Sequence, residues 1–566
     1  MKKLIRNNKY LLIILLIAAL LRLWGLNQGD PLGDEGDLAF RAIGMLDFDA
    51  AAAQTTPLEW FDPDIPSWTR LSFHDHPPLV FLIQNIFMKI FGENNFGFRF
   101  PSALFGVVSV YLLYLIGRRL FTENVGLLSA AIMALTANHV FISRVGLQES
   151  YVIFFILIAT YFFLKALREA NYLIWTGAAV GLGMLAKYTV FIVAPIFVIY
   201  LLTFRRDYFR NKKLYLGALL AIIIFSPVII YNIKLYQAVG HFDFQISYLL
   251  GQNPEAWQTA PGKEEIGTLA DRLKNFIPNL INSNSWVLLL LFGATIPAFL
   301  ILFFKDPKES LKNKELLSIT YILLILMLLF IGPTRRFLTM LTPFFAINAA
   351  LILDLIYEKF LKNRKQIAVG LLSGFLAFEG LYSVNSQITS YPIGQNPWAY
   401  SKIRLESYNW GYNELNEYLR KELQNKGPAL TFQTKYQFLE DIKARGLHKA
   451  EQKGFESYPA LIIYDGNIFN SAQLWIFDRL QIYQGWPAIN ARVYFNLLNE
   501  QGQNSFLRAG IKVYYFIMPT DKVPLRKTAE LNDHGINFEQ QLIAREIVPH
   551  TLTNKHGEEV FRVYKF

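Results

Sequence analysis

Long apolar runs, separated by short polar segments, dominate the first two thirds of the chain. Each run is close to the length of helix that crosses about 30 Å of hydrocarbon, and a helix satisfies its own backbone polar groups there. The pattern therefore predicts eleven transmembrane helices. They are expected at residues 10–26, 97–117, 125–142, 150–167, 172–186, 189–204, 214–233, 286–304, 315–332, 337–357 and 366–383.

The basic residues between these runs indicate an orientation. With a cytoplasmic N-terminus, the Lys/Arg-rich connections all fall inside, as the positive-inside bias requires. These connections are at residues 118–119, 165–168, 205–213, 305–314 and 359–365. To keep all of these connections inside, residues 172–204 must form two short spans that turn near Lys187. The same condition requires the apolar run Pro77 to Phe91 to lie along the outer surface.

Composition agrees with a polytopic membrane protein, since 53% of residues are hydrophobic and 17% are charged. The net charge of +11 would suggest a nucleic-acid partner in a soluble chain, but here the inner loops account for it. The first run follows a basic segment and no small-residue cleavage site comes after it, so we expect a retained signal-anchor. The chain has no cysteine, which excludes disulfides, thiol catalysis and zinc-thiolate sites.

Three segments are expected outside the membrane. Two are loops, residues 27–96 and 234–284, within a transmembrane domain of residues 1–383. The third, residues 384–566, has no further spans and alternates short β-like runs with helical pattern, so it predicts an extracytoplasmic α/β domain. Strands are expected at residues 429–432, 460–464, 512–518 and 559–566, and a helix at 413–423.

The string GDEGDLAF, residues 33–40, places three carboxylates directly after the first span. Asp34, Glu35 and Asp37 stand where ionisable groups are costly unless they face a polar cavity. The spacing also fits an ordinary solvated loop. We interpret the cluster as functional on the strength of the motifs that follow it.

Six strings in order resemble one family. After the acidic pair come HDHPPL (residues 74–79), FGFRFPSALFG (96–106), SRVGLQES (143–150), GLGMLAKYTVFIVAP (181–195) and RRFLTMLTPFFAI (335–347). Together they resemble the GT-C glycosyltransferases, above all the protein mannosyltransferase family and its bacterial relatives, which include the lipid A aminoarabinose transferases. The resemblance covers roughly residues 10–350. It implies a multispan GT-C fold.

The resemblance also implies an activity. A sugar would pass from a polyprenyl-phosphate carrier to a protein, lipid or glycan acceptor, with inversion, at the outer face of the plasma membrane. The acceptor hydroxyl must lose a proton as it attacks, which calls for a positioned carboxylate. Asp34 matches the family's catalytic aspartate, and Glu35 is the reserve candidate for the base or for a group that orients Asp34.

The leaving phosphate requires cations or hydrogen-bond donors at membrane depth. Lys187 occupies the turn where the family places a phosphate-contacting lysine, and Arg335 or Arg336 opens the outer end of a span. Either kind of cation could also simply snorkel to the interface. Glu149 stands where many relatives have Asp, and Arg144 could hold that carboxylate or contact the carrier phosphate.

The string HDHPPL bears on the sugar and on a metal. His76 stands where aminoarabinose enzymes tend to have Lys and mannosyltransferases have His, which favours a neutral hexose. His74, Asp75 and His76, with His241 of the second loop, could form a divalent-metal site, because imidazole and carboxylate are competent ligands. Surface hydrogen bonding is the alternative role for such a cluster.

Three other functions share some of these sequence features. A transporter or flippase would also have many spans, but typically shows repeated halves, which this sequence lacks. An oligosaccharyltransferase should carry a WWDYG-type string, and the nearest segment here, NWGYNE at residues 409–414, lacks the aspartate. A noncatalytic membrane sensor that uses the outer domain remains the third alternative.

Overall fold

The computed structural model describes residues 2–47, 66–252, 267–305, 314–403, 409–434, 437–526 and 531–566. Their internal contacts divide the chain into two units. The first unit comprises Met1–Leu26 and Trp68–Leu405, and the second comprises Asn27–Ser67 and Glu406–Phe566. The external segment expected at residues 27–96 is therefore divided between the units.

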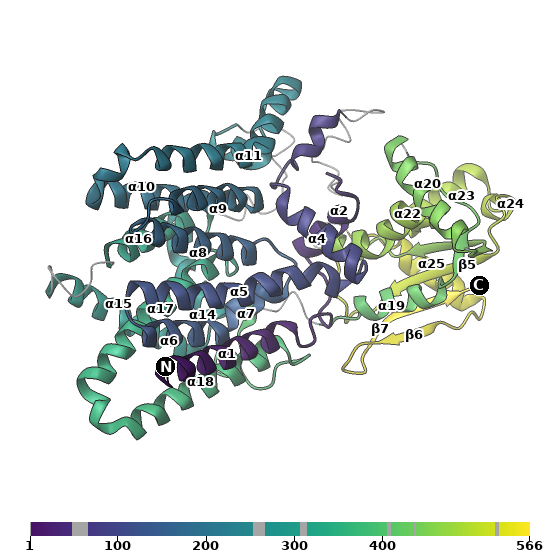
Figure 1. The fold of residues 1–566 in the computed structure, drawn as a ribbon. Helices are drawn as coiled ribbons and strands as arrows, with labels where there is room; N and C mark the ends of the chain where they lie inside the picture. The colour runs from purple at the N-terminus through teal and green to yellow at the C-terminus, as the bar shows by residue number, and fades with distance from the viewer. Residues whose placement is uncertain are drawn as a thin grey trace. The chain divides into compact units, whose positions relative to one another are not determined.

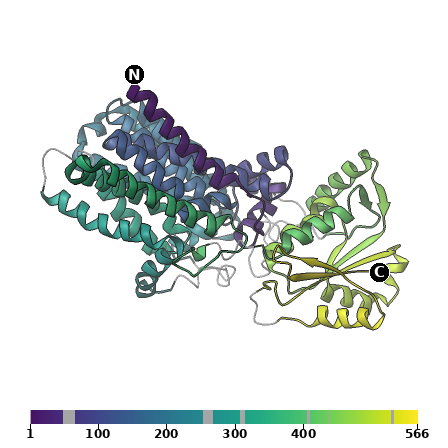
Figure 2. The same ribbon diagram turned by 90° about the horizontal axis from the view of Figure 1, so that it is seen from below.

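The first unit is helical, and most of its helices coincide with the expected spans (Figure 1). These helices are α1 (Lys2–Leu23), α5 (Asn95–Leu120), α8 (Glu149–Ala166), α9 (Tyr172–Ala186), α10 (Val193–Phe204), α11 (Lys212–Val239), α15 (Trp286–Lys305), α16 (Lys314–Ile331), α17 (Thr342–Ile356) and α18 (Lys365–Gln387). The helices α5, α8 and α9 run side by side (Figures 1 and 2). Among the described residues, four helical segments are long and apolar enough to cross a membrane, and shorter apolar helices accompany them.

One expected span is not a continuous helix. Residues 125–142 were predicted as a single helix, whereas the structure has α6 (Glu123–Leu135) and α7 (Ala137–Arg144), bent by 62° at the break. The buried Arg22 of α1 donates hydrogen bonds to the carbonyls of Met133 (3.3 Å) and Ala134 (3.1 Å) at this break. These carbonyls end α6 and need partners within the bundle, which the guanidinium provides.

Close packing explains several glycines of the first unit. A Cβ atom at Gly177 of α9 would lie 1.9 Å from the carbonyl oxygen of Gly217 in α11. A Cβ atom at Gly183 would lie 2.5 Å from the side chain of Val190. Small residues allow helix backbones to approach in this way. The interpretation of the string GLG at residues 181–183 as a packing feature is therefore confirmed.

Several short elements connect the long helices of this unit. They are the 3₁₀ and π turns η1 (Ser67–Leu71), η2 (Tyr188–Ile192), η3 (Arg206–Arg210), η5 (Phe337–Leu341), η6 (Tyr357–Leu361) and η7 (Lys362–Arg364), and the helices α4 (Leu79–Phe91), α12 (Phe244–Leu249) and α14 (Leu269–Ser283). The helix breaks at Lys187 as expected, because Lys187 is extended between α9 and η2, and the reversal between two short spans stays a prediction. The short run at α4 forms a helix of 13 residues, and its position along the membrane surface stays a prediction.

The second unit contains a mixed sheet with strand order β4-β3-β5-β7-β6. The strands β4 (Ala488–Asn490), β3 (Ala460–Tyr464) and β5 (Val513–Pro519) are parallel, and β7 (Glu559–Lys565) and β6 (His550–Thr553) complete the sheet in antiparallel pairing. A separate parallel pair joins β1 (Lys426–Pro428) and β2 (Glu456–Tyr458). The predicted strand at residues 429–432 is wrong, since the strand ends at Pro428, whose ring cannot donate a ladder hydrogen bond.

Both faces of the interior strand β3 are covered, as its uninterrupted run ALIIY requires. Leu461 and Ile463 share a buried cluster with Phe516 and with Phe538 and Leu542 of α25 (His534–Ala544). On the other face, the ring of Tyr464 stacks on Phe477 at 4.0 Å. The remaining helical elements are α2 (Asp34–Gly44), α19 (Tyr412–Glu422), α20 (Gln437–Gln452), α21 (Asn470–Gln473), η9 (Leu474–Asp478), α22 (Arg479–Gln484), α23 (Ala491–Gln501) and α24 (Ser505–Arg508).

Candidate functional site

A buried carboxylate and two cations meet at the N-terminal end of α8. Glu149 is the first residue of α8, and its side chain is 1% exposed. Lys187 Nζ donates a hydrogen bond to Glu149 Oε1 at 2.7 Å. Arg336 Nε lies 3.7 Å from the same oxygen. Segments separated by some 190 residues of sequence are thus joined by one carboxylate.

The two cations also share an aromatic neighbour. Lys187 Nζ lies 4.8 Å, and the Arg336 guanidinium carbon 5.2 Å, from the centre of the Phe337 ring. Cations at such distances are attracted by the ring face. The side chains of Lys187 and Arg336 remain 16% and 34% exposed, so solvent or a ligand can reach them. The second oxygen of Glu149 is buried and has no hydrogen-bond partner among the described residues.

The other arginines of the predicted set contact backbone carbonyls. Arg144 donates to the carbonyls of Leu21 (2.9 Å), Trp24 (2.7 Å) and Gly25 (3.0 Å), just where α1 ends. Arg335 donates to the carbonyl of Lys402 at 3.0 Å. Of the proposed basic residues, Lys187 and Arg336 are therefore the two that the structure brings to Glu149.

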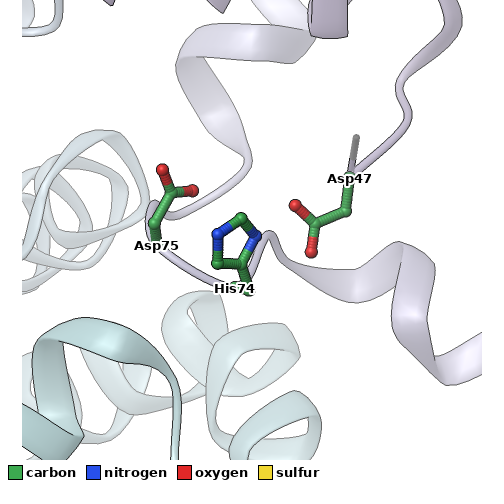
Figure 3. Close-up of side chains that lie close together, drawn as sticks. All are labelled: Asp47, His74 and Asp75. Atoms are coloured by element: carbon green, nitrogen blue, oxygen red, sulfur yellow. The ribbon is translucent and has the colours of Figure 1, made fainter. Parts of the chain in front are cut away.

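The HDHPP loop is held by the start of the short helix α12. The Phe244 N–H donates to the carbonyl of His74 at 2.8 Å, and the Gln245 side chain donates to that of Asp75 at 3.3 Å. The Asp75 carboxylate lies 2.9 Å from His76 Nδ1. Figure 3 shows the His74 and Asp75 side chains on this loop. A buried imidazole beside a carboxylate is a donor set suited to a divalent metal.

Two further residues bear on the metal prediction. His241 does not extend the set, because its Nδ1 donates to the carbonyl of its neighbour Phe242 at 2.8 Å, and it lies outside the described acidic and histidine residues that group closely enough for a metal. The role of His241 as a ligand stays a prediction. Figure 3 also draws Asp47, a residue of the second unit. The Asp47 carboxylate accepts a 2.8 Å hydrogen bond from Arg41.

The acidic cluster forms the first turn of α2 in the second unit. Gly33 precedes the helix with a φ of 72°, a conformation that favours glycine, and Asp34, Glu35 and Asp37 follow. Carboxylates are stabilised at a helix N-terminus by its unpaired N–H groups. Asp34 is exposed, whereas Glu35 is 2% exposed. The adjacent carboxylates therefore have different environments, as their neighbouring positions on a helix predict.

Sequence reasoning missed two buried aspartates. Asp243 begins α12, accepts backbone N–H groups from Gln245 and Ile246, and also accepts from the Tyr188 hydroxyl at 2.5 Å. Burial raises the pKa of Asp243, and these donors oppose the rise. Asp30 accepts four backbone N–H groups in the second unit. The helix-start spacing around residue 243 was a local signal, whereas the partners of Asp30 are some 380 residues away.

The fold as a whole matches a known class. It is similar to ArnT from Cupriavidus metallidurans, solved with bound undecaprenyl phosphate, at a TM-score of 0.52 and 14% identity over 98% of each chain. A mostly helical unit with membrane-length helices, followed by a mixed sheet, is thus the GT-C type of fold. The more specific assignment comes from the sequence. Residues 75–231 match the family described as dolichyl-phosphate-mannose-protein mannosyltransferase.

Two curated relatives agree with this family. YkcB of Bacillus subtilis, provisionally named a mannosyltransferase, is 30% identical over 213 residues, or 34% of this chain and 29% of YkcB. The undecaprenyl phosphate-alpha-4-amino-4-deoxy-L-arabinose arabinosyl transferase of Wigglesworthia glossinidia brevipalpis is 26% identical over 158 residues, or 26% of this chain and 28% of that protein. The chain therefore aligns with less than a third of either relative.

Proposed function

We propose that this chain is an inverting glycosyltransferase of the outer face of the plasma membrane. It moves a sugar from a polyprenyl phosphate to a hydroxyl of a protein, lipid or glycan acceptor. The observation that carries the proposal is the pair of cations, Lys187 and Arg336, held beside a buried carboxylate at one end of a membrane helix. The undecaprenyl phosphate bound to the structural relative supports a lipid-phosphate donor.

The cations serve the leaving group. As the bond between the anomeric carbon and the phosphate oxygen breaks, negative charge grows on the carrier phosphate. Lys187 and Arg336 stabilise that charge, and Phe337 limits where the two side chains lie. Glu149 keeps the cations in place before the donor binds. Its second oxygen, buried beside them, accepts a hydrogen bond from a donor hydroxyl or a water.

The base is a carboxylate of the acidic cluster. The acceptor hydroxyl gives its proton to Asp34 while its oxygen attacks the anomeric carbon from the face opposite the phosphate, so the configuration inverts. Exposure of Asp34 to solvent supports this role, since an acceptor must reach it. Burial of Glu35 supports the lesser role of orienting its neighbour.

The remaining elements of the proposal concern the metal, the sugar and the topology. His74 and Asp75 would hold a divalent cation, which in such a site supplies Lewis-acid stabilisation of phosphate charge. His76 before two prolines favours a neutral hexose over aminoarabinose. The eleven predicted spans, with residues 384–566 outside, place the acidic cluster and the cation pair on the same outer side.

A donor panel tests the reaction. The purified protein is incubated with radiolabelled polyprenyl-phosphate sugars, and release of the lipid phosphate is followed together with sugar transfer. A glycosyltransferase cleaves the carrier bond with at least one donor. A transporter or flippase in vesicles moves the label across the bilayer without cleavage, and that result would contradict the proposal.

Substitution of the acidic pair tests the base. Asp34→Asn keeps the side-chain shape but loses basicity, so single-turnover transfer with donor bound should slow at least about 10²-fold while donor affinity is unchanged. Glu35→Gln should slow it less. Asp441→Asn is the matched control, an exposed aspartate on α20 of the same unit. A normal transfer rate in Asp34→Asn with an inactive Glu35→Gln would reassign the base to Glu35. Normal transfer rates in both variants would show that neither carboxylate is the base.

A further inference from the structure

Asp30 lies on the N-terminus of α19. Its carboxylate is fully buried, and Oδ2 accepts backbone N–H groups from Trp410 (2.5 Å), Gly411 (3.0 Å) and Tyr412 (3.4 Å). Oδ1 accepts the N–H of Asn413 at 2.8 Å. These N–H groups include the donors that a helix leaves unpaired at its start. Asp30 therefore provides, from a remote segment, the cap that α19 lacks locally.

The partner segment is shaped for this contact. Gly411 has a φ of 112°, and a Cβ atom there would lie 2.5 Å from the Val560 side chain, so glycine is required on both counts. The Asn413 side chain donates to the carbonyl of Gln28 at 3.1 Å, beside Asp30. The string NWGYNE is thus the start of a helix that receives an anion. The acceptor here is an internal carboxylate.

The chain from Asp30 to α2 is attached to the same unit at further points. The Gly33 N–H donates to the Ser471 hydroxyl at 2.9 Å, and the Tyr483 hydroxyl donates to the carbonyl of Phe40 at 3.0 Å. A Cβ atom at Gly36 would lie 3.1 Å from Ser471. The acidic residues Asp34 and Glu35 are in the middle of this attached stretch. Their backbone is thus held by α21 and α22 on both sides.

We propose that Asp30 is a positioning residue for the transfer reaction, and that a role of the C-terminal α/β unit is to hold the acidic helix α2 in place through it. The link to catalysis rests on the proposed function of Asp34, whereas the anchoring of α2 does not. Both oxygens of Asp30 accept hydrogen bonds from backbone N–H groups. An asparagine offers one acceptor and turns an NH₂ group toward N–H groups, so Asp30→Asn should release the anchor.

A thiol reporter measures the anchoring directly, because the chain has no native cysteine. Ala39 of α2 is fully buried, so Ala39→Cys should react slowly with an impermeant maleimide. Ala488→Cys in β4, 3% exposed, reports on the fold of the unit. Burial raises the pKa of Asp30 to about 7, so labelling is done near pH 8, where it is ionised. Glu417→Gln is the matched control, an exposed carboxylate of α19.

We expect Asp30→Asn to speed labelling of Ala39→Cys at least about tenfold while Ala488→Cys stays protected, and Glu417→Gln to change neither. In transfer assays Asp30→Asn should lower kcat about tenfold with unchanged donor Kd. Ser471→Ala, which removes the Gly33 contact, should show the same pattern more weakly. Labelling of Ala39→Cys at the control rate overturns the anchoring, and equal exposure of both reporters makes Asp30 a folding determinant and overturns the positioning role.

The two proposals fail differently. If Asp34→Asn transfers sugar normally, Asp34 is not the base, but the labelling result for Asp30→Asn still decides whether α2 is anchored. If α2 is released in Asp30→Asn while kcat stays normal, the positioning role is wrong and the assignment of Asp34 is judged by its own variant.

Discussion

The two ends of α8 both gather basic side chains, but these have different partners. At the C-terminal end, Arg119 donates to the carbonyl of Leu164 (3.2 Å) and Arg205 to that of Leu167 (3.3 Å). The Lys165 ammonium lies 3.7 Å from the centre of the Tyr172 ring. Helix C-termini present unpaired carbonyls and a partial negative charge, which cations complement. These cations therefore have a structural role.

At the N-terminal end the helix itself repels cations, because its unpaired N–H groups carry partial positive charge. Lys187 and Arg336 are kept there by the buried Glu149. Cations that are held by a carboxylate, and not by helix carbonyls, can redirect hydrogen bonds to an incoming anion without unravelling a helix end. The comparison thus separates basic residues that complete the bundle from those suited to a ligand.

The largest expected difference is in thiol labelling, because the two ends of α8 are predicted to lie on opposite sides of the membrane. Glu93→Cys, in the exposed loop before α5, should react fully with an impermeant thiol reagent in intact cells. Glu169→Cys, in the exposed loop after α8, should react only after lysis. Labelling of Glu169→Cys in intact cells, or equal labelling of both positions, would contradict the eleven-span topology. It would also contradict the placement of the two ends of α8 on opposite sides of the membrane.

The second-largest effect should be a loss of stability when the Glu149 carboxylate is removed. Glu149→Gln leaves two cations beside a helix N-terminus without their counter-charge, which should lower the free energy of unfolding by about 3 kcal/mol. Glu149→Asp, which keeps the charge one methylene shorter, should cost less. Thermal unfolding in detergent measures both. A Glu149→Gln protein as stable as the parent would show that Lys187 and Arg336 are held by other contacts.

Donor binding distinguishes the two ends functionally. Lys187→Ala should weaken affinity for a polyprenyl phosphate by more than about tenfold, and Lys187→Arg should restore part of it, because charge matters most but the fork geometry differs. Lys165→Ala is the matched control at the other end of α8. Equilibrium binding of labelled carrier measures all three. Equal affinity in Lys187→Ala and Lys165→Ala would reduce Lys187 to an interfacial anchor.

The smallest effect should come from an exposed pair at the C-terminal end. Arg205 and Asp207 lie 3.1 Å apart, with 36% and 65% of their side chains exposed. Asp207→Asn should therefore leave the midpoint of thermal unfolding nearly unchanged, and transfer unchanged as well. Thermal unfolding and the transfer assay measure this. A loss of stability as large as that of Glu149→Gln would mean that burial does not explain the difference between the two ends of α8.

Much of the fold could be predicted because it follows from local patterns. Apolar runs mark α5, α8, α9 and α11 within a few residues. The break between α6 and α7 was missed, because the apolar run continues through Thr136 and the partner of the freed carbonyls, Arg22, lies more than 100 residues earlier. The strand predicted at residues 429–432 is wrong because this apolar run follows Pro428, where the strand ends.

For the candidate site, residue types were predictable and partners were not. The motifs around Lys187 and Arg336 indicated cations at span ends, yet the partner considered for Glu149 was Arg144, and packing brings Lys187 and Arg336 to it instead. His241 was grouped with His74 by type alone, and its loop directs the ring to its own backbone.

The sequence by itself determined the membrane class, the helix periods, the absence of thiol chemistry and the order of the family motifs, because each is written in neighbouring residues. Tertiary structure decided which charges meet. Asp30 with α19, Arg22 with the end of α6 and Glu149 with Lys187 join segments far apart in the chain. Electrostatic and hydrogen-bond energies depend on distances of a few ångströms and on burial, and neither is encoded by local spacing.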